Sequence, residues 1–193
     1  MKRQIRSRVW ETNSSSCHAI YCNGEDFIED DTSFLESCIE NDGYLHIKFG
    51  EFGWEVKDYT DCFTKLQYAL TMVAETECRY RPMQSEDDTI DFEKTEGFKA
   101  INDLIADKLD CAGVIVDSEM ELVKYDSNWN KGVTMIGLSH DGYIDHQSST
   151  DDYSSLQDFL DRYALTLEGF IFDENVVLHT DNDNRYQDED DYE

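Results

Sequence analysis

An excess of acidic side chains is the feature that most limits what this chain can fold into. The sequence has 44 Asp and Glu residues against 16 Lys and Arg, so its formal net charge at pH 7 is -28 over 193 residues. Carboxylates repel one another, and burying one without a partner is costly. A compact fold must therefore keep most of them at the surface, around a core made from the other residues.

The apolar content is sufficient for such a core. Hydrophobic residues make up 39% of the chain and aromatic residues 12%, whereas disordered acidic chains are poor in aromatic and β-branched residues. The length fits one domain. We therefore expect a single acidic domain over residues 1–180 and a flexible acidic tail over residues 181–193, where aliphatic side chains are almost absent.

Helices and strands alternate along the predicted domain. Apolar residues recur at helical spacing in residues 61–77 and 94–109, and two capping boxes, Ser33 with Glu36 and Ser154 with Gln157, predict two shorter helices. Asp141-Gly142 predicts a tight hairpin. Strands are expected at residues 18–22, 44–49, 112–116, 133–138, 143–146, 170–172 and 176–179.

This order of elements predicts an α+β or α/β fold, with a single mixed sheet and about three packed helices. The pattern leaves open whether the strands run parallel or antiparallel. The six cysteines are expected to be thiols in core packing or metal ligands, because Met1 to Gln4 lead into no apolar signal segment and no membrane span occurs. The expected location is the cytosol.

The sequence contains none of the phosphate-binding, zinc-protease or serine-hydrolase motifs, so we expect a protein that is not an enzyme. Cys17, His18 and Cys22 nevertheless lie close together, and thiolate and imidazole are ligands that zinc prefers. Strand alternation places His18 and Cys22 on one face and Cys17 on the other, so at most two could share a metal. The alternatives are buried thiols, with His18 bonded to the serine turn at residues 14–16.

A second histidine cluster extends from His140 to His146. In the predicted hairpin, Asp145 shares the face of His140, while His146 points to the opposite face. The sequence therefore favours an exposed hairpin tip here over a set of metal ligands. A zinc-stabilised module, or an enzyme centred on His18 and residues 14–16, is the main functional alternative.

The acids themselves carry the strongest functional signal. A surface this negative repels nucleic acid and anionic membranes. A compact domain of this length is roughly 40 Å across, and 40 Å of duplex DNA carries about 24 charges. The charge of -28 thus favours a basic partner that handles nucleic acid over a plain acidic protein. The predicted contact residues are Glu25, Asp26, Glu29, Asp30, Asp31, Glu86, Asp87 and Asp88.

Residues 10–18 contain three consecutive serines between an asparagine and a Cys-His pair. With Arg6 and Val9, this stretch resembles an N-terminal signature of small uncharacterised proteins from bacteriophages and Gram-positive bacteria. The likeness covers about residues 3–22. Size and charge further resemble the small acidic anti-CRISPR and anti-restriction inhibitors of phages. That resemblance implies, as partner, the RNA-guided nuclease of a type II CRISPR system in a bacterial cytosol, with DNA loading blocked.

Overall fold

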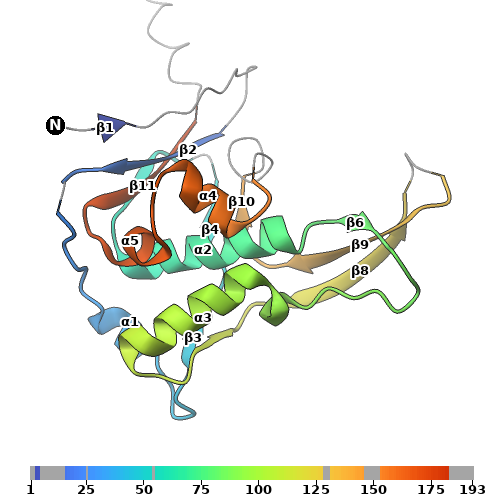
Figure 1. The fold of residues 1–193 in the computed structure, drawn as a ribbon, viewed down its shortest axis with the longest axis horizontal. Helices are drawn as coiled ribbons and strands as arrows, with labels where there is room; N and C mark the ends of the chain where they lie inside the picture. Colours follow the sequence, from blue (N-terminus) through green and yellow to red (C-terminus); the bar gives the residue numbers. More distant parts are fainter. Residues whose placement is uncertain are drawn as a thin grey trace, which may run out of the picture.

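A buried helix, α2 (Cys62–Glu77), lies at the centre of the fold. The computed structural model describes residues 3–4, 16–24, 26–53, 55–127, 131–145 and 153–182, with backbone alone for residues 3–4, 16–17 and 181–182. Around α2 lie α1 (Ser33–Ser37), a 3-10 turn η1 (Phe92–Lys94), α3 (Glu96–Leu109), α4 (Leu156–Arg162) and α5 (Leu167–Phe172) (Figure 1).

The described strands form four separate sheets. An antiparallel sheet has the order β1 (Arg3–Gln4), β2 (Ser16–Cys22), β11 (Val176–Asn182), β5 (Lys57–Tyr59), and a second has the order β6 (Arg81–Pro82), β9 (Thr134–His140), β8 (Met120–Asp126). Two parallel pairs complete the set, β3 (Leu45–Ile47) with β7 (Val114–Val116), and β4 (Glu51–Phe52) with β10 (Tyr143–Ile144).

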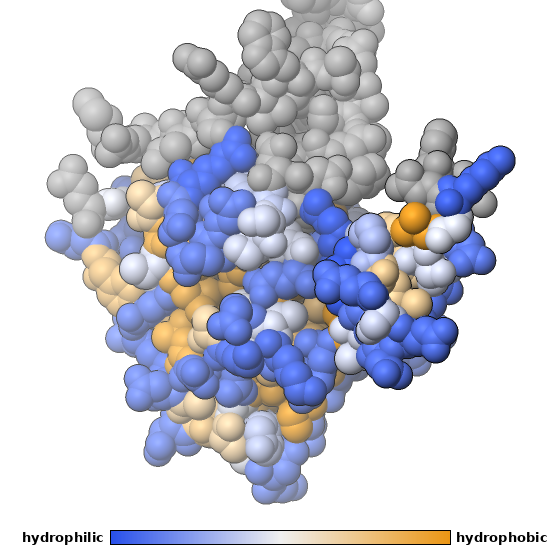
Figure 2. Space-filling model, turned by 45° about the vertical axis from the view of Figure 1, so that its right-hand side comes forward, coloured by the Kyte–Doolittle hydropathy of each residue, from blue (hydrophilic) through white to orange (hydrophobic). Residues whose placement is uncertain are grey.

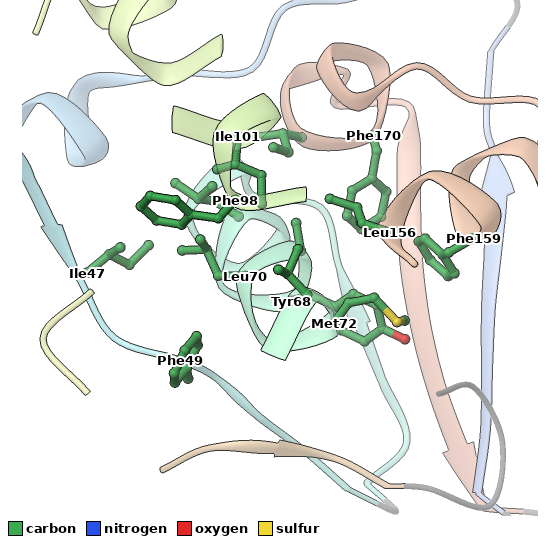
Figure 3. Packing of buried hydrophobic residues seen from close by; sticks show 14 of the residues in the cluster. Ile47, Phe49, Tyr68, Leu70, Met72, Phe98, Ile101, Leu156, Phe159 and Phe170 are labelled. Carbon is green, nitrogen blue, oxygen red and sulfur yellow. The ribbon is translucent and has the colours of Figure 1, made fainter. Parts of the chain in front are cut away.

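Aromatic side chains fill the space between α2 and the C-terminal elements. The Tyr68 ring of α2 lies 5.8 Å from Phe159 of α4 and 6.2 Å from Phe170 of α5, between ring centroids. Phe159 and Phe170 pack edge to face at 5.6 Å, a favourable arrangement of two rings (Figure 3). Because all three rings are at most 2% exposed, this cluster holds α4 and α5 against α2.

One carboxylate joins three helices. Glu77, at the C-terminal end of α2, accepts hydrogen bonds from the Gly97 N–H of α3 at 3.0 Å and the Leu156 N–H of α4 at 3.4 Å. Both N–H groups belong to the first turn of a helix, where backbone N–H groups have no partner within their own helix. Gly97 is required because a Cβ there would lie 2.4 Å from the Glu77 Oε1 atom and 2.5 Å from Val73.

The buried ammonium group of Lys65 links α2 to the segment between α5 and β11. Its Nζ atom donates to the backbone carbonyls of Asp173 at 2.8 Å and Val176 at 3.3 Å. The residue is 0% exposed, and burial lowers the pKa of the ammonium. The bonded carbonyls replace part of the hydration that this cation loses.

The mixed α and β composition and the two long helices are confirmed, with α2 and α3 close to their predicted bounds. Asp61 and Thr95 cap them by accepting the N–H groups of Thr64 and Phe98. The single sheet is not confirmed, since the described strands separate into four sheets. Strand β11 runs to Asn182, two residues into the segment assigned to the tail.

Several finer predictions were wrong. The expected hairpin is absent: β9 pairs with β6 and β8, whereas β10 pairs with β4. Residues 170–172 belong to helix α5, whose first turn is capped by Thr166. The capping boxes are also shifted, because Thr32 is the N-cap of α1 without a side-chain cap and Ser155, not Ser154, caps α4.

No helix in the described part of the chain is both long and apolar enough to cross a membrane.

Replacing Glu77 by alanine should destabilise the fold by about 1–3 kcal/mol, because two helix N-terminal N–H groups lose their acceptor. Urea unfolding measures this loss. Asp103→Ala, at an exposed position of α3, is the matched control and should change the unfolding free energy by less than about 0.5 kcal/mol. Equal effects of the two substitutions would contradict the bridging role of Glu77.

Candidate partner-binding surface

The first acidic cluster is largely engaged in local structure. Glu29 pairs with Lys108 at 2.8 Å, and Lys108 also contacts Glu168. The Asp31 carboxylate accepts the Ser33 N–H at 2.9 Å, just before α1. The Oδ2 atom of Asp30 is buried without a hydrogen-bond partner among the described residues. Asp26 is exposed, and Glu25 lies outside the described residues.

The second acidic cluster is divided between an ion pair and two exposed acids. Asp88 binds the Arg81 guanidinium through two bonds of 2.6 and 2.7 Å and also accepts the Gln84 N–H. The hydrogen bond from Arg81 holds the pKa of this carboxyl well below its usual range. Glu86 and Asp87 are exposed. The two predicted clusters lie at opposite ends of the molecule, near α1 and β6 (Figure 1).

Beside the second cluster, β6, β8 and β9 project from the body with the residues next to them; we call residues 80–91, 119–127 and 131–140 the arm (Figure 1). The arm exposes large apolar side chains, with relative exposures of 37% for Met120 and Leu122, 46% for Tyr125 and 40% for Tyr80. Tyr80 and Tyr125 pack edge to face at 5.4 Å. β8 and the Tyr80 ring lie outside the main core. The sequence pattern alone does not show this, because apolar residues of an exposed strand and of the core look alike in the sequence.

Glycine brings one of these rings close to the sheet. A Cβ at Gly137 of β9 would lie 2.3 Å from the Cδ1 atom of Tyr80, so only glycine leaves room for the ring. The arm also exposes carboxylates, those of Glu86, Asp87, Glu119, Glu121 and Asp126. Figure 2 shows hydrophobic colours on the projecting part, between hydrophilic side chains.

Two of the three predicted zinc ligands, the side chains of His18 and Cys22, are described. His18 is 6% exposed, with Nδ1 3.3 Å from the Tyr68 hydroxyl and Nε2 3.3 Å from the Gly53 carbonyl. His18 and Cys22 are four residues apart on β2, or about 13 Å along a regular strand. The Cys17 side chain and residues 5–15 lie outside the described part.

The described cysteines Cys22, Cys38, Cys62, Cys78 and Cys111 are free thiols. Burial raises the pKa of Cys62 and of Cys78 to about 12. His140 contacts the Asp141 carbonyl at 2.9 Å and the Phe49 ring at 5.1 Å, while His146 is not among the described residues. Within the described residues, no group of three or more His, Cys, Asp or Glu side chains is placed to hold a metal ion.

Two polar clusters escaped the sequence analysis. On the four-stranded sheet, one oxygen of Asp58 accepts the Tyr21 hydroxyl at 2.6 Å and lies 2.6 Å from Nδ1 of His179. Burial and this bond raise the pKa of Tyr21 to about 12. His179 lies opposite both Asp58 and Ala19 in the register. Only the strand register reveals this cluster, because its members are far apart in sequence.

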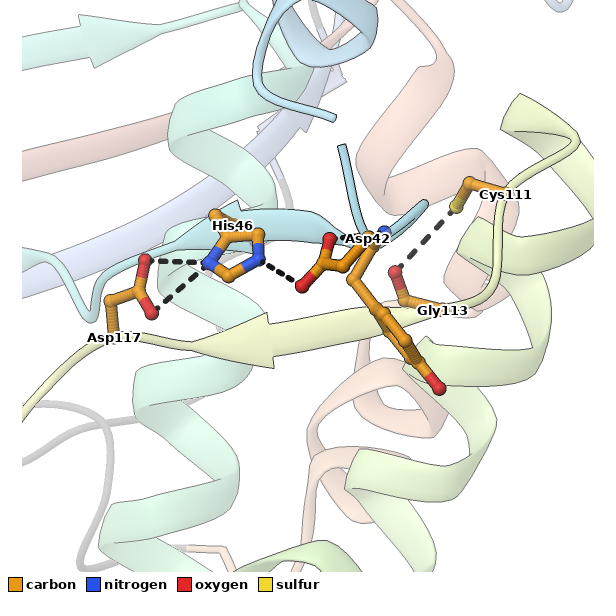
Figure 4. A network of polar contacts seen from close by, with 6 residues as sticks. Asp42, His46, Cys111, Gly113 and Asp117 are labelled. Carbon is orange, nitrogen blue, oxygen red and sulfur yellow. Dashed lines mark hydrogen bonds and ion pairs between the residues drawn. The ribbon is translucent and has the colours of Figure 1, made fainter. Parts of the chain in front are cut away.

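The other cluster surrounds His46 of β3. Its Nε2 atom lies 3.1 Å from Asp42, and its Nδ1 atom lies 3.0 Å from Asp117, which follows β7 (Figure 4). The bond to Asp42 and then that to Asp117 raise the pKa of His46. The i, i+4 spacing of Asp42 and His46 gives a weak signal for the first contact. The second contact depends on the parallel pairing of β3 with β7.

No protein-family model matches this chain, and comparison with curated proteins and with solved structures gave no significant match.

The burial of His18 predicts a loss of stability in acid. Burial lowers its pKa from 6.5 to about 4 in the folded protein, so the unfolded chain takes up a proton first as the pH falls. The neutral ring therefore stabilises the fold fully above pH 6.5, and about 3 kcal/mol of this is lost as the pH falls to about 4. In urea unfolding, the stability gap between wild type and His18→Gln should narrow over that range; a constant gap would contradict the assignment.

The sign is opposite for His46. Because its folded pKa lies above 6.5, its stabilising contribution is complete below pH 6.5 and is lost as the pH rises through the folded value. NMR titration of the His46 ring should give a midpoint above 6.5 in the wild type and a lower midpoint in Asp117→Asn. An identical midpoint in the two proteins would remove Asp117 as a cause.

Proposed function

We propose that the protein is a non-enzymatic acidic inhibitor that binds the basic nucleic-acid-handling surface of a host defence nuclease through its arm. The observation that carries the proposal is the arm itself. Exposed tyrosine, methionine and leucine side chains with a charged border are the composition of a protein-protein interface. The net charge of -28 favours a basic partner and fast, salt-sensitive association.

The pairing of cations supports this partner class. Lys94, Lys99 and Lys108 contact Asp91, Glu96 and Glu29, and Arg81 is held by Asp88. These cations are therefore already neutralised within the protein. The arm exposes two further cations, Lys124 and Lys131, but more carboxylates, so it remains negative toward a basic partner; these carboxylates are Glu86, Asp87, Glu119, Glu121 and Asp126.

The first target to test is the guide-loaded nuclease of a type II CRISPR system. Its channel for guide RNA and target DNA must be basic to hold two nucleic-acid backbones. A protein whose acidic arm entered that channel, or covered a lobe beside it, would block DNA loading. Entry into the channel requires negative charge of this protein to be distributed along the partner's groove, whereas binding to a lobe beside the channel requires only the arm.

Target-DNA binding by the guide-loaded nuclease should fall as this protein is added, with weaker inhibition at about 0.15 M salt than at low salt, because the Debye length shortens to about 8 Å. A binding assay with labelled target DNA at both salt concentrations measures this. No inhibition at excess protein would exclude this target. Inhibition that disappears with a chelator would instead favour the zinc-stabilised module.

Paired charge variants locate the surface. Glu119→Gln with Glu121→Gln removes two charges from the arm and should weaken inhibition by about fivefold, since each exposed charge contributes about 0.5 kcal/mol. Asp103→Asn with Asp107→Asn removes the same charge from α3 and is the matched control. Equal loss in the two variants would indicate a general effect of net charge and contradict binding through the arm.

A further inference from the structure

Strand β8 forms an open edge of the arm. All seven of its residues pair with β9, and the strand order β6-β9-β8 places β8 at the border of its sheet. No described strand pairs with its other side. Six of its seven residues are exposed. A strand in this position presents unpaired N–H and C=O groups to any extended segment that approaches.

The register identifies those groups. The Ser127 N–H donates to the Val133 carbonyl at 2.9 Å, and the Glu119 carbonyl accepts the Asp141 N–H at 3.1 Å. The odd-numbered residues between 119 and 127 therefore direct their backbone groups toward β9, because direction alternates along a strand. The open edge carries the N–H and C=O groups of the even-numbered residues Met120, Leu122, Lys124 and Asp126.

Proteins protect such edges with charge, proline, bulges or a cover. Here β8 contains no proline; Glu119 precedes it, Glu121 lies within it, and the Lys124 ammonium donates to the Glu86 carbonyl at 3.5 Å. A second copy of this chain carries the same net charge of -28 and is repelled. A basic segment is attracted, so charge at this edge selects between the two.

We propose that the edge of β8 binds an extended, basic segment of the partner as an added strand. The inference rests on the proposed function and specifies how its surface is recognised. Backbone groups of Met120, Leu122, Lys124 and Asp126 supply the hydrogen bonds of the new ladder. Glu119 and Glu121 attract alternate Lys or Arg side chains, and exposed Met120 and Leu122 contact apolar residues between them.

A peptide of alternating lysine and valine with the seven-residue length of β8 is the probe, and the same peptide with glutamate for lysine is its control. The full chain should bind the lysine peptide in a fluorescence anisotropy titration and bind the glutamate peptide far more weakly. Hydrogen exchange should slow at the even-numbered amides of β8 on binding. The odd-numbered amides, already paired with β9, should change little.

Leu122→Pro removes one edge N–H without removing a bond to β9, and proline is tolerated where an edge N–H faces solvent. It should weaken peptide binding by about tenfold, whereas Leu122→Ala, which keeps the N–H, should lose much less. Equal losses, or protection spread evenly over β8, would overturn the proposal. Self-association of the wild type that Leu122→Pro abolishes would assign the edge to a second copy and overturn it as well.

The same variants separate this inference from the proposed function. If the wild type inhibits the nuclease and Leu122→Pro inhibits it equally, strand addition is wrong while the inhibitor function stands. If the lysine peptide binds with the expected exchange pattern but the nuclease is unaffected, the edge is supported and the proposed target is wrong.

Discussion

The scarcity of cations is the constraint on which the rest of the structure depends. With 16 Lys and Arg for 44 acids, each internal cation has a disproportionate structural effect. Lys65 is enclosed in the core and holds the carbonyls of Asp173 and Val176, so the chain leaving α5 must return past α2. Removing the ammonium would take a buried donor from both carbonyls, although the Asp173 carbonyl would still accept the Val176 N–H at 3.0 Å. Such a loss costs more than losing a surface pair.

The same principle explains how peripheral segments are attached. Lys108 of α3 lies between Glu29 and Glu168, so it joins the segment before α1 to the start of α5. Arg81 fixes the loop after β6 through Asp88, and carboxylates act as linkers where cations are absent, as Glu77 does between α3 and α4. Acids that appear alike in the sequence therefore divide into structural acceptors and exposed charges.

That division limits what the sequence could predict. Helices α2 and α3 follow from local spacing and caps, and both were predicted, but the pairing of β9 with β8 and of β10 with β4 depends on contacts between distant segments. Residues 170–172 form a short apolar run that is compatible with a strand or with a helix. Thr166 caps the first turn and so favours the helix. Glu29 and Asp31 resembled exposed charges in the sequence, because the contact of Glu29 with Lys108 and that of Asp31 with the Ser33 N–H are visible only in the fold. The cluster of Tyr21, Asp58 and His179 could not be predicted, because only the strand register brings its members together.

The arm differs physically from the body. In the body, α2 is enclosed by helices and sheets, and its apolar side chains are buried against them. In the arm, Tyr80 and Tyr125 pack on each other and remain 40% and 46% exposed, and β8 has no described neighbour on its outer side. Exposed rings are unfavourable in water, whereas the edge backbone groups are hydrated but available to pair with another strand. Negative charge reduces self-association without covering the rings or the edge. A partner that supplied an apolar face and a strand together would cover the rings and pair with the edge, and for this reason we propose the arm, and not the larger acidic surface, as the recognition site.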